Sequence, residues 1–301
     1  MSTLLKPKFK ELPYSSFGGA PLLHALWNRF DLSLLLTQSG IFKKSGVATW
    51  KFAFFFVVGL MARCSSCLQM VKFYEKDALL RAMFGGKAVS QSAFSRFLVS
   101  PFNWRLFNLK RVAKFQEDAQ TQLVDGDIIA LDDSLIAHNH ARKIPFIYRL
   151  WDHCTETYIN ALNLVVLHAK KASGLQYPLF YSIWKQDNGE DPHLTRLDLA
   201  LAMLTELRGQ VAENLKLWVC FDAGYYGTDF YLAVEKLKFF WVTRAKINTP
   251  LFRKVKIRGK ERFIPITPET LFKEAKPIFA FWQKKGNLCM AFKNIYIAID
   301  E

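Results

Sequence analysis

The chain has 301 residues, 51% hydrophobic and 15% aromatic, which excludes a globally disordered protein and is enough for one large or two modest domains. Its formal net charge of +15 favours a polyanionic partner, nucleic acid or an anionic membrane, with nucleic acid preferred; the alternative is a soluble enzyme that is merely basic. The most hydrophobic stretch, residues 52–62, is too short to span a bilayer as a helix and predicts a buried helix. The first residues carry no signal peptide and the five cysteines are scattered, so we expect a cytoplasmic protein with reduced thiols.

Residues 1–122 are predicted to form an all-helical region. Ser90 is expected to cap a helix whose apolar residues include Phe94 and Phe97, and Pro101 is expected to end it. A second helix with several basic side chains is predicted over residues 103–115. DNA binding by this pair of helices is one interpretation, although short basic helices are also common on other protein surfaces.

From residue 123 onward the pattern alternates between strands and helices. Strands are expected at residues 128–131, 157–169, 177–185, 217–221 and 239–248, and helices at residues 193–214 and 227–238. The first three strands can form a meander, and helices of crossover length return parallel strands to the same sheet. We therefore expect an α/β fold, with a mixed sheet that has helices on both faces, after the helical amino-terminal region.

Two aspartates stand where predicted strands end, Asp132 after residues 128–131 and Asp222 after residues 217–221. Either one alone would be read as a turn former. If the two strands are neighbours, however, the carboxylates converge at an edge of the sheet where ligands gather. Close carboxylates repel and raise each other's pKa, and Mg²⁺ is a common means of offsetting that repulsion. Held by carboxylates in a strongly basic chain, Mg²⁺ indicates phosphodiester chemistry on nucleic acid.

Four segments carry a resemblance to a known family: IIALDDS, WDHCTETYINALNLVVLHA, LWVCFDAGYYG and FFWVTRAKIN. Block by block they resemble the RNase H-like catalytic domain of bacterial insertion-sequence transposases of the DDE class. The resemblance covers about residues 122–250 and implies that Asp132 and Asp222 are catalytic metal ligands for Mg²⁺, with Mn²⁺ as a substitute. Asp133 is the competing choice for the first carboxylate, because adjacent residues of a strand point to opposite faces.

The resemblance fails at one point, which concerns the third carboxylate of the family. That residue is a Glu on a helix after the fifth strand, in a Tyr-x-x-Arg-x-x-x-Glu setting that is missing after Tyr296. Residues 251–301 resemble the start of a β-rich segment that some members insert before that helix. Glu269, Glu274 and Glu301 stand in the wrong context. We therefore expect a chain that ends before its catalytic helix and is inactive on its own.

The resemblance also implies a partner, double-stranded DNA at transposon ends and at a target, with pairing of two copies on the DNA and no membrane. Arg142, Lys143, Arg244 and Lys246 are the expected phosphate contacts, which position DNA without reading its sequence. Location in the bacterial cytoplasm, on the nucleoid when bound, follows from this. Two other interpretations stay open: a non-catalytic DNA-binding transposase fragment, and an RNase H-like nuclease that uses fewer or different carboxylates.

Overall fold

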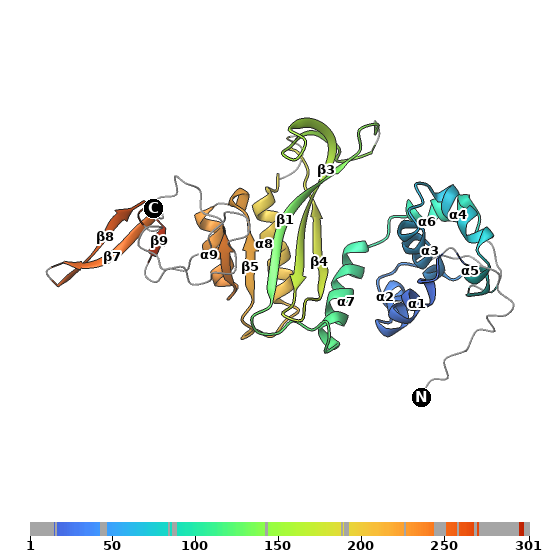
Figure 1. The fold of residues 1–301 in the computed structure, drawn as a ribbon, viewed down its shortest axis with the longest axis horizontal. Helices are drawn as coiled ribbons and strands as arrows, with labels where there is room; N and C mark the ends of the chain where they lie inside the picture. The colour runs from blue at the N-terminus through green and yellow to red at the C-terminus, as the bar shows by residue number, and fades with distance from the viewer. Residues whose placement is uncertain are drawn as a thin grey trace. The chain divides into compact units, whose positions relative to one another are not determined.

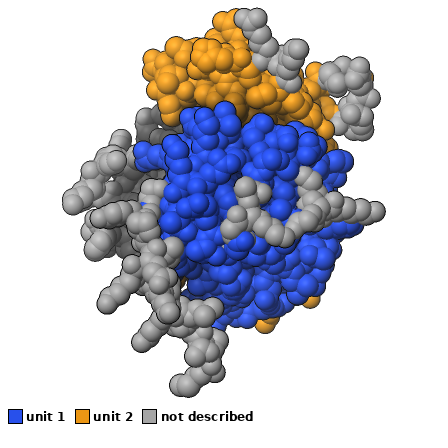
Figure 2. Space-filling model, turned by 90° about the vertical axis from the view of Figure 1, so that its right-hand side faces the viewer, with its two compact units in different colours: residues 1–123, 209–211 blue, residues 124–208, 212–301 orange. Residues whose placement is uncertain are grey.

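The computed structural model describes residues 15, 17–42, 47–83, 85, 89–141, 144–187, 189, 193–225, 227–243, 251–257, 259–267, 270 and 295–297. The chain divides into two compact units: residues 1–123 with 209–211 form unit 1, and residues 124–208 with 212–301 form unit 2 (Figure 2). Its helices and mixed sheet make this an α/β protein. No helix within the described ranges is long and apolar enough to cross a membrane.

The described elements of unit 1 are all helices (Figure 1). They are α1 (Ala20–Arg29), α2 (Leu32–Gln38), α3 (Thr49–Met61), α4 (Cys67–Lys76), α5 (Ala78–Met83), α6 (Gln91–Leu98) and α7 (Trp104–Glu117). Four begin with a side chain that accepts a hydrogen bond from a first-turn backbone N–H: Ser66 before α4, Asp77 before α5, Ser90 before α6 and Asn103 before α7. The cap at Ser90 confirms the start predicted for that helix.

Aromatic side chains form the core of unit 1. On α3, Phe52, Phe54 and Phe55 are each at most 4% exposed, which confirms the buried helix predicted from residues 52–62. The Phe55 ring lies 4.2 Å from that of Tyr74, and the Phe52 ring lies 5.4 Å from that of Phe97. Because each such ring buries a large apolar area, these contacts between α3, α4 and α6 stabilise the unit.

Unit 2 is built on a six-stranded sheet (Figure 1). Its strands are β1 (Ile128–Ala137), β2 (Tyr148–Asp152), β3 (Thr157–Lys170), β4 (Gln176–Ile183), β5 (Trp218–Phe221) and β6 (Phe240–Thr243). The order is β2-β3-β1-β5-β6, and β4 also pairs with β3. β3 pairs antiparallel with both β1 and β4, as expected for the predicted meander. β5 is parallel to β1, and β6 is parallel to β5. The sequence did not predict β2.

Two helices cover one face of this sheet: α8 (Arg196–Arg208) contacts β3 and β4, and α9 (Thr228–Lys236) contacts β6. That face carries Leu131 of β1, and it also carries Phe221 of β5, on which Tyr231 of α9 stacks. The prediction of helices on both faces differs from this arrangement, since the described helices of unit 2 share one face. The other face keeps apolar side chains in solvent, with Trp218 40% exposed.

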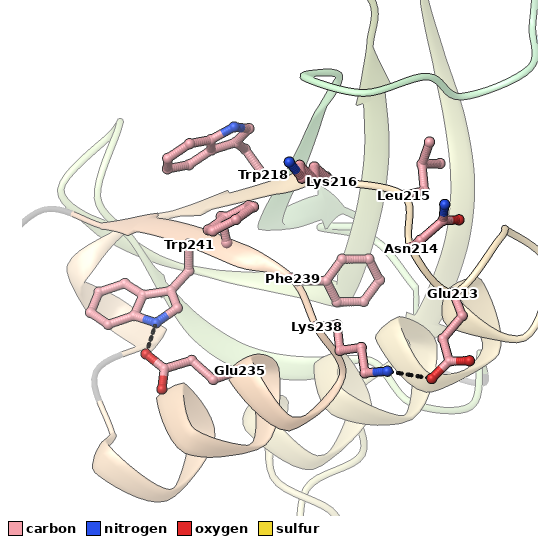
Figure 3. A pocket seen from close by; sticks show the side chains of 10 residues that line it. Glu213, Asn214, Leu215, Lys216, Trp218, Glu235, Lys238, Phe239 and Trp241 are labelled. Carbon is pink, nitrogen blue, oxygen red and sulfur yellow. Dashed lines mark hydrogen bonds and ion pairs between the residues drawn. The ribbon is translucent and has the colours of Figure 1, made fainter.

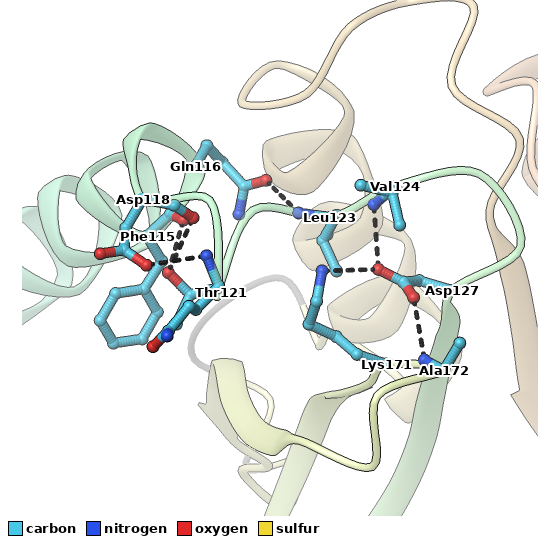
Figure 4. A network of polar contacts seen from close by, with 10 residues as sticks. Phe115, Gln116, Asp118, Thr121, Leu123, Val124, Asp127, Lys171 and Ala172 are labelled. Carbon is cyan, nitrogen blue, oxygen red and sulfur yellow. Dashed lines mark hydrogen bonds and ion pairs between the residues drawn. The ribbon is translucent and has the colours of Figure 1, made fainter.

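A buried ion pair fixes the start of β1. Asp127 precedes that strand, and its Oδ2 accepts hydrogen bonds from Nζ of Lys171 at 3.1 Å and from the backbone N–H of Val124 at 2.9 Å (Figure 4). Its Oδ1 accepts from the backbone N–H of Ala172 at 3.3 Å. The carboxylate therefore ties the chain before β1 to the turn between β3 and β4.

A second sheet lies in the segment expected to be β-rich. It contains β7 (Leu251–Ile257), β8 (Lys260–Ile266) and β9 (Ile295–Ile297), in the order β8-β7-β9 with antiparallel pairing. Several large apolar side chains of the β7–β8 hairpin are solvent-exposed, among them Phe263 at 57%. Both strands also carry basic residues, among them Arg253 and Lys256 on β7 and Lys260 and Arg262 on β8.

Candidate active site

The pairing of β1 with β5 brings Asp132 and Asp222 together. The two strands are parallel, and the last pair of Cα partners is Leu131 with Phe221. Asp132 and Asp222 are the next residues on each strand path. Asp132 alternates with Leu131 and so points to the face opposite α8 and α9, and the charge of Asp222 acts on it. The prediction that the two strands are neighbours is confirmed, and the aspartates sit at one edge of the sheet.

The pKa of Asp132 is affected by desolvation and by the nearby charge of Asp222. The residue as a whole is exposed, yet neighbouring protein atoms desolvate its carboxyl, and this is the main reason why the pKa of Asp132 is raised above its ordinary value. The backbone N–H of Asp133 donates to Oδ1 of Asp132 at 2.9 Å, which opposes the rise in pKa. The negative charges of Asp133 and Asp222 add to the rise. A bound cation would relieve this repulsion.

The carboxyl group of Asp222 is oriented by the turn that follows it. The backbone N–H of Gly224 donates to Oδ1 of Asp222 at 2.7 Å, and the Thr243 hydroxyl donates to the Asp222 carbonyl oxygen at 3.2 Å. A Cβ atom placed on Gly224 would lie only 2.9 Å from that Oδ1. Sequence reasoning missed Gly224, although a glycine two residues after a strand-end aspartate is a readable signal.

Asp133 lies on the other face of the sheet, the one that α8 covers. Its Oδ2 accepts from Nδ2 of Asn163 on β3 and from Nη1 of Arg196 at the start of α8, both at 3.0 Å. The sequence left Asp132 and Asp133 as alternatives for the first carboxylate. In the structure, Asp132 is on the open face and near the charge of Asp222, whereas Asp133 is engaged in an ion pair on the face that α8 covers.

Tyr225 stands close to all three carboxyl groups. It ends the short 3-10 turn Ala223–Tyr225, is 2% exposed, and its hydroxyl has no hydrogen-bond partner among the described residues. Burial is the main reason why the pKa of this phenol lies well above its ordinary value, and the charge of Asp133 raises it further. Arg196 acts in the opposite direction. Neither Tyr225 nor Arg196 was singled out from the sequence.

Several predicted site residues lie outside the described part of the chain. These are the four basic residues expected to contact DNA and the three glutamates considered for a third carboxylate: Arg142, Lys143, Arg244, Lys246, Glu269, Glu274 and Glu301. Within the described ranges, no group of three or more His, Cys, Asp or Glu side chains is arranged to hold a metal ion. The described site is therefore a pair of carboxylates.

A pocket of about 570 Å³ lies elsewhere in unit 2, at the amino-terminal ends of β5 and β6 (Figure 3). Trp218 and Trp241 line it, and so does the exposed ion pair between Lys238 and Glu213. Because the aspartates lie at the carboxyl ends of the strands, this pocket is not part of their site.

Comparison with protein families and with curated proteins gives no match. A proposal for this chain therefore depends on the carboxylate pair, its surroundings and the charge of the chain.

Proposed function

We propose that this chain is a DDE-type transposase that acts on DNA by Mg²⁺-dependent phosphodiester hydrolysis and strand transfer. The observation that carries the proposal is the placement of Asp132 and Asp222, which follow the paired residues Leu131 and Phe221 at one edge of the sheet. Two solvent-accessible carboxylates at the carboxyl ends of neighbouring strands are suited to hold a divalent cation against an incoming phosphate.

The strand order supports an RNase H-like core. Three antiparallel strands, β1, β3 and β4, precede two strands that extend the sheet parallel to β1. α8 comes after the third of them and α9 comes between β5 and β6, which is the succession of elements that the resemblance implies. β2 is an addition to that succession and pairs with the outer end of β3.

The donor atoms of the two carboxylates fit Mg²⁺. Each has its Oδ1 held by a backbone N–H, Asp133 for Asp132 and Gly224 for Asp222, which orients the group and leaves the second oxygen for a cation. Neither aspartate has a Lys or Arg ion-pair partner among the described residues. Bound Mg²⁺ would supply Lewis-acid activation of a phosphodiester there. The residues themselves bind and orient.

DNA is the proposed partner because of charge. A net charge of +15 produces a strong non-specific attraction to the phosphate backbone. We assign the positioning of that backbone to Arg142 and Lys143, which follow β1 in sequence, and to Arg244 and Lys246, which follow β6. Two copies on one DNA would follow from the family's mode of action.

Metal binding is the direct test. Mn²⁺ titrated into the protein and followed by electron paramagnetic resonance should bind, and Asp132→Asn and Asp222→Asn should each abolish or strongly weaken that binding. Asp229→Asn, at an exposed aspartate on α9, is the matched control and should bind as the wild type does. No binding by the wild type, or undiminished binding by Asp132→Asn, would overturn the proposal.

A second assay separates the catalytic from the non-catalytic interpretation. Supercoiled plasmid is incubated with the protein and Mn²⁺ or Mg²⁺, and nicked circles are measured alongside binding of the same DNA. Nicking that disappears in Asp132→Asn supports a catalytic site. DNA binding without metal-dependent nicking supports the non-catalytic DNA-binding fragment instead.

A further inference from the structure

The two adjacent aspartates of β1 point to opposite faces of the sheet and are joined by a hydrogen bond. Asp132 faces the open side of the sheet and Asp133 faces α8, yet the backbone N–H of Asp133 donates to Oδ1 of Asp132 at 2.9 Å. Any movement of Asp133 therefore moves the donor that orients Asp132. What holds the side chain of Asp133 in place thus also decides how Asp132 is presented to solvent.

Asp133 is held from two other elements. Nδ2 of Asn163, on β3, and Nη1 of Arg196, the first residue of α8, both donate to its Oδ2 at 3.0 Å. The side chain of Asp133 is 21% exposed and Asn163 is 6% exposed, so these are partly desolvated, charge-assisted contacts. Such hydrogen bonds are stronger than neutral ones. They join β1, β3 and α8 at one point.

The turn that bears Asp222 is held on the same face of the sheet through Tyr225. The tyrosine ring packs against Phe221 and Phe230 on the face that carries α9, with ring centroids 6.4 Å and 6.3 Å apart. Burial raises the pKa of its hydroxyl, the charge of Asp133 raises it further, and the charge of Arg196 lowers it. The backbone N–H of Tyr225 donates to the Asp222 carbonyl oxygen at 3.3 Å. Tyr225 therefore anchors the Asp222 turn on the face of the sheet that carries α9.

A contact of this kind is needed because backbone pairing stops short of the site. The β1–β5 ladder ends at Leu131 and Phe221, so no strand pairing fixes the distance between the two carboxylates. Without a cation, the two like charges favour separation. Side-chain contacts behind the sheet oppose this separation, together with the Thr243 hydroxyl that donates to the Asp222 carbonyl oxygen.

We propose that Asp133, Arg196, Asn163 and Tyr225 form a positioning cluster that holds Asp132 and Asp222 at the separation a divalent cation requires. This inference rests on the proposed metal site. The four residues do not touch the cation. They act through the Asp133 backbone N–H on one side and through the Asp222 turn on the other, as outer-shell partners of metal ligands do.

Mn²⁺ affinity without DNA tests the cluster. Arg196→Ala and Asp133→Asn should each weaken Mn²⁺ binding about tenfold, the lower end of the range for outer-shell substitutions. Arg196→Lys keeps a positive donor and should recover most of that affinity. Glu213→Gln, which breaks the exposed pair with Lys238, is the matched control and should change nothing. Melting temperatures measured without metal show whether each variant is folded.

A double-mutant cycle distinguishes positioning from general loosening of the fold. If Arg196 acts through Asp133, then Arg196→Ala combined with Asp133→Asn should weaken Mn²⁺ binding no more than either single change does. Two losses that multiply would overturn the inference. So would wild-type affinity in both single variants while Asp132→Asn abolishes binding, a result that leaves the proposed function standing. A wild-type chain that binds no Mn²⁺ would overturn the proposed function itself, and the positioning cluster with it.

Discussion

Nζ of Lys171 lies 3.1 Å from Oδ2 of Asp127, and both side chains are more than nine-tenths buried. An ion pair at such a site loses its hydration and is maintained only when its remaining hydrogen-bonding positions are satisfied. Asp127 meets this condition with two backbone amides, those of Val124 and Ala172. The pair joins the entry to β1 to the turn between β3 and β4.

Removal of the carboxylate should therefore destabilise unit 2 strongly. Asp127→Ala leaves the Lys171 charge buried and two backbone amides without their acceptor, and the expected loss is about 3–5 kcal/mol. Urea denaturation measures it. Breaking the exposed Glu213–Lys238 pair with Glu213→Gln should cost less than about 1 kcal/mol. Equal losses for the two variants would show that burial does not control the strength of the first pair.

The raised pKa of Asp132 predicts that replacing this carboxyl with a neutral side chain increases folding stability in a pH-dependent way. A carboxyl whose folded-state pKa is raised, here mainly by desolvation, penalises folding at pH values above that pKa. The penalty is absent below the unfolded-state pKa, which is about 3.9 for Asp. Metal-free Asp132→Asn should therefore be more stable than the wild type at pH 7, and the difference should vanish as the pH falls below about 4.

Thermal unfolding of the two metal-free proteins across this pH range measures that difference. Asn retains the oxygen that accepts from the Asp133 N–H, so the local hydrogen bond survives the change. A variant that gains stability while it loses Mn²⁺ would indicate that Asp132 is maintained for binding and not for folding. A stability loss at pH 7 would contradict this interpretation.

The sheet was predictable from sequence to the extent that strand signals are strong. The apolar run 128–131, the β-branched stretch 157–169 and residues 217–221 each lie within β1, β3 or the β5 region, because buried strands need such side chains. β2 was missed because it has only five residues, of which Arg149 and Asp152 are charged and none is fully buried. Residues 244–248 of the last predicted strand lie outside the described part of the chain.

Helix placement on the sheet was less predictable. Trp218 and Phe221 are equally apolar in sequence, yet Phe221 is 6% exposed under α9 and Trp218 is 40% exposed on the other face. A continuous apolar run is typical of strands covered on both faces, and composition alone does not show that one face stays open.

The site was predictable only in its linear part. Asp132 and Asp222 can be recognised because each directly follows a short apolar run, which is a local sequence signal. Arg196 and Asn163 reach Asp133 across 63 and 30 residues of sequence, so no spacing rule points to them. Their contact depends on how α8 begins and on the register of β3 against β1.

Packing between α3 and α4 predicts the effect of a substitution in unit 1. A Cβ atom on Gly59 would lie 2.5 Å from Cγ of Met70, which is 4% exposed. Gly59→Ala gains about 1 kcal/mol of helix propensity but costs about 1–3 kcal/mol of overpacking, so a net destabilisation is expected. In thermal unfolding, Met70→Ala should cost less in the Gly59→Ala background than in the wild type. Strictly additive losses would contradict direct contact.

The charge of the chain predicts a salt-sensitive affinity for duplex DNA. Each neutralised phosphate contributes about −0.9 to the slope of log K against log salt, so three contacts would weaken binding about 40-fold between 50 and 200 mM salt. Fluorescence anisotropy with a labelled duplex of arbitrary sequence measures this slope. Affinity that stays constant with salt, or that is absent at low salt, would remove DNA from the proposed function.

Gly224 offers the sharpest test of how Asp222 is oriented. A methyl group at this position would lie 2.9 Å from Oδ1 of Asp222, closer than real Cβ contacts occur. The backbone of Gly224 is outside the left-handed region, so alanine is tolerated there, and the carboxyl can rotate away at little cost. Gly224→Ala should therefore leave the melting temperature nearly unchanged and weaken Mn²⁺ binding about tenfold, as misoriented metal ligands do.

The matched control for Gly224→Ala is Gly227→Ala, three residues further along. Its Cβ would meet only Cδ1 of Leu197 at 3.4 Å and Cβ of Phe230 at 3.7 Å, which are ordinary contacts. This variant should bind Mn²⁺ as the wild type does, although both changes add the same methyl group to the same segment. If Gly224→Ala binds Mn²⁺ with wild-type affinity, Asp222 does not need its present orientation to hold the cation, and its assignment as a metal ligand loses its geometric support.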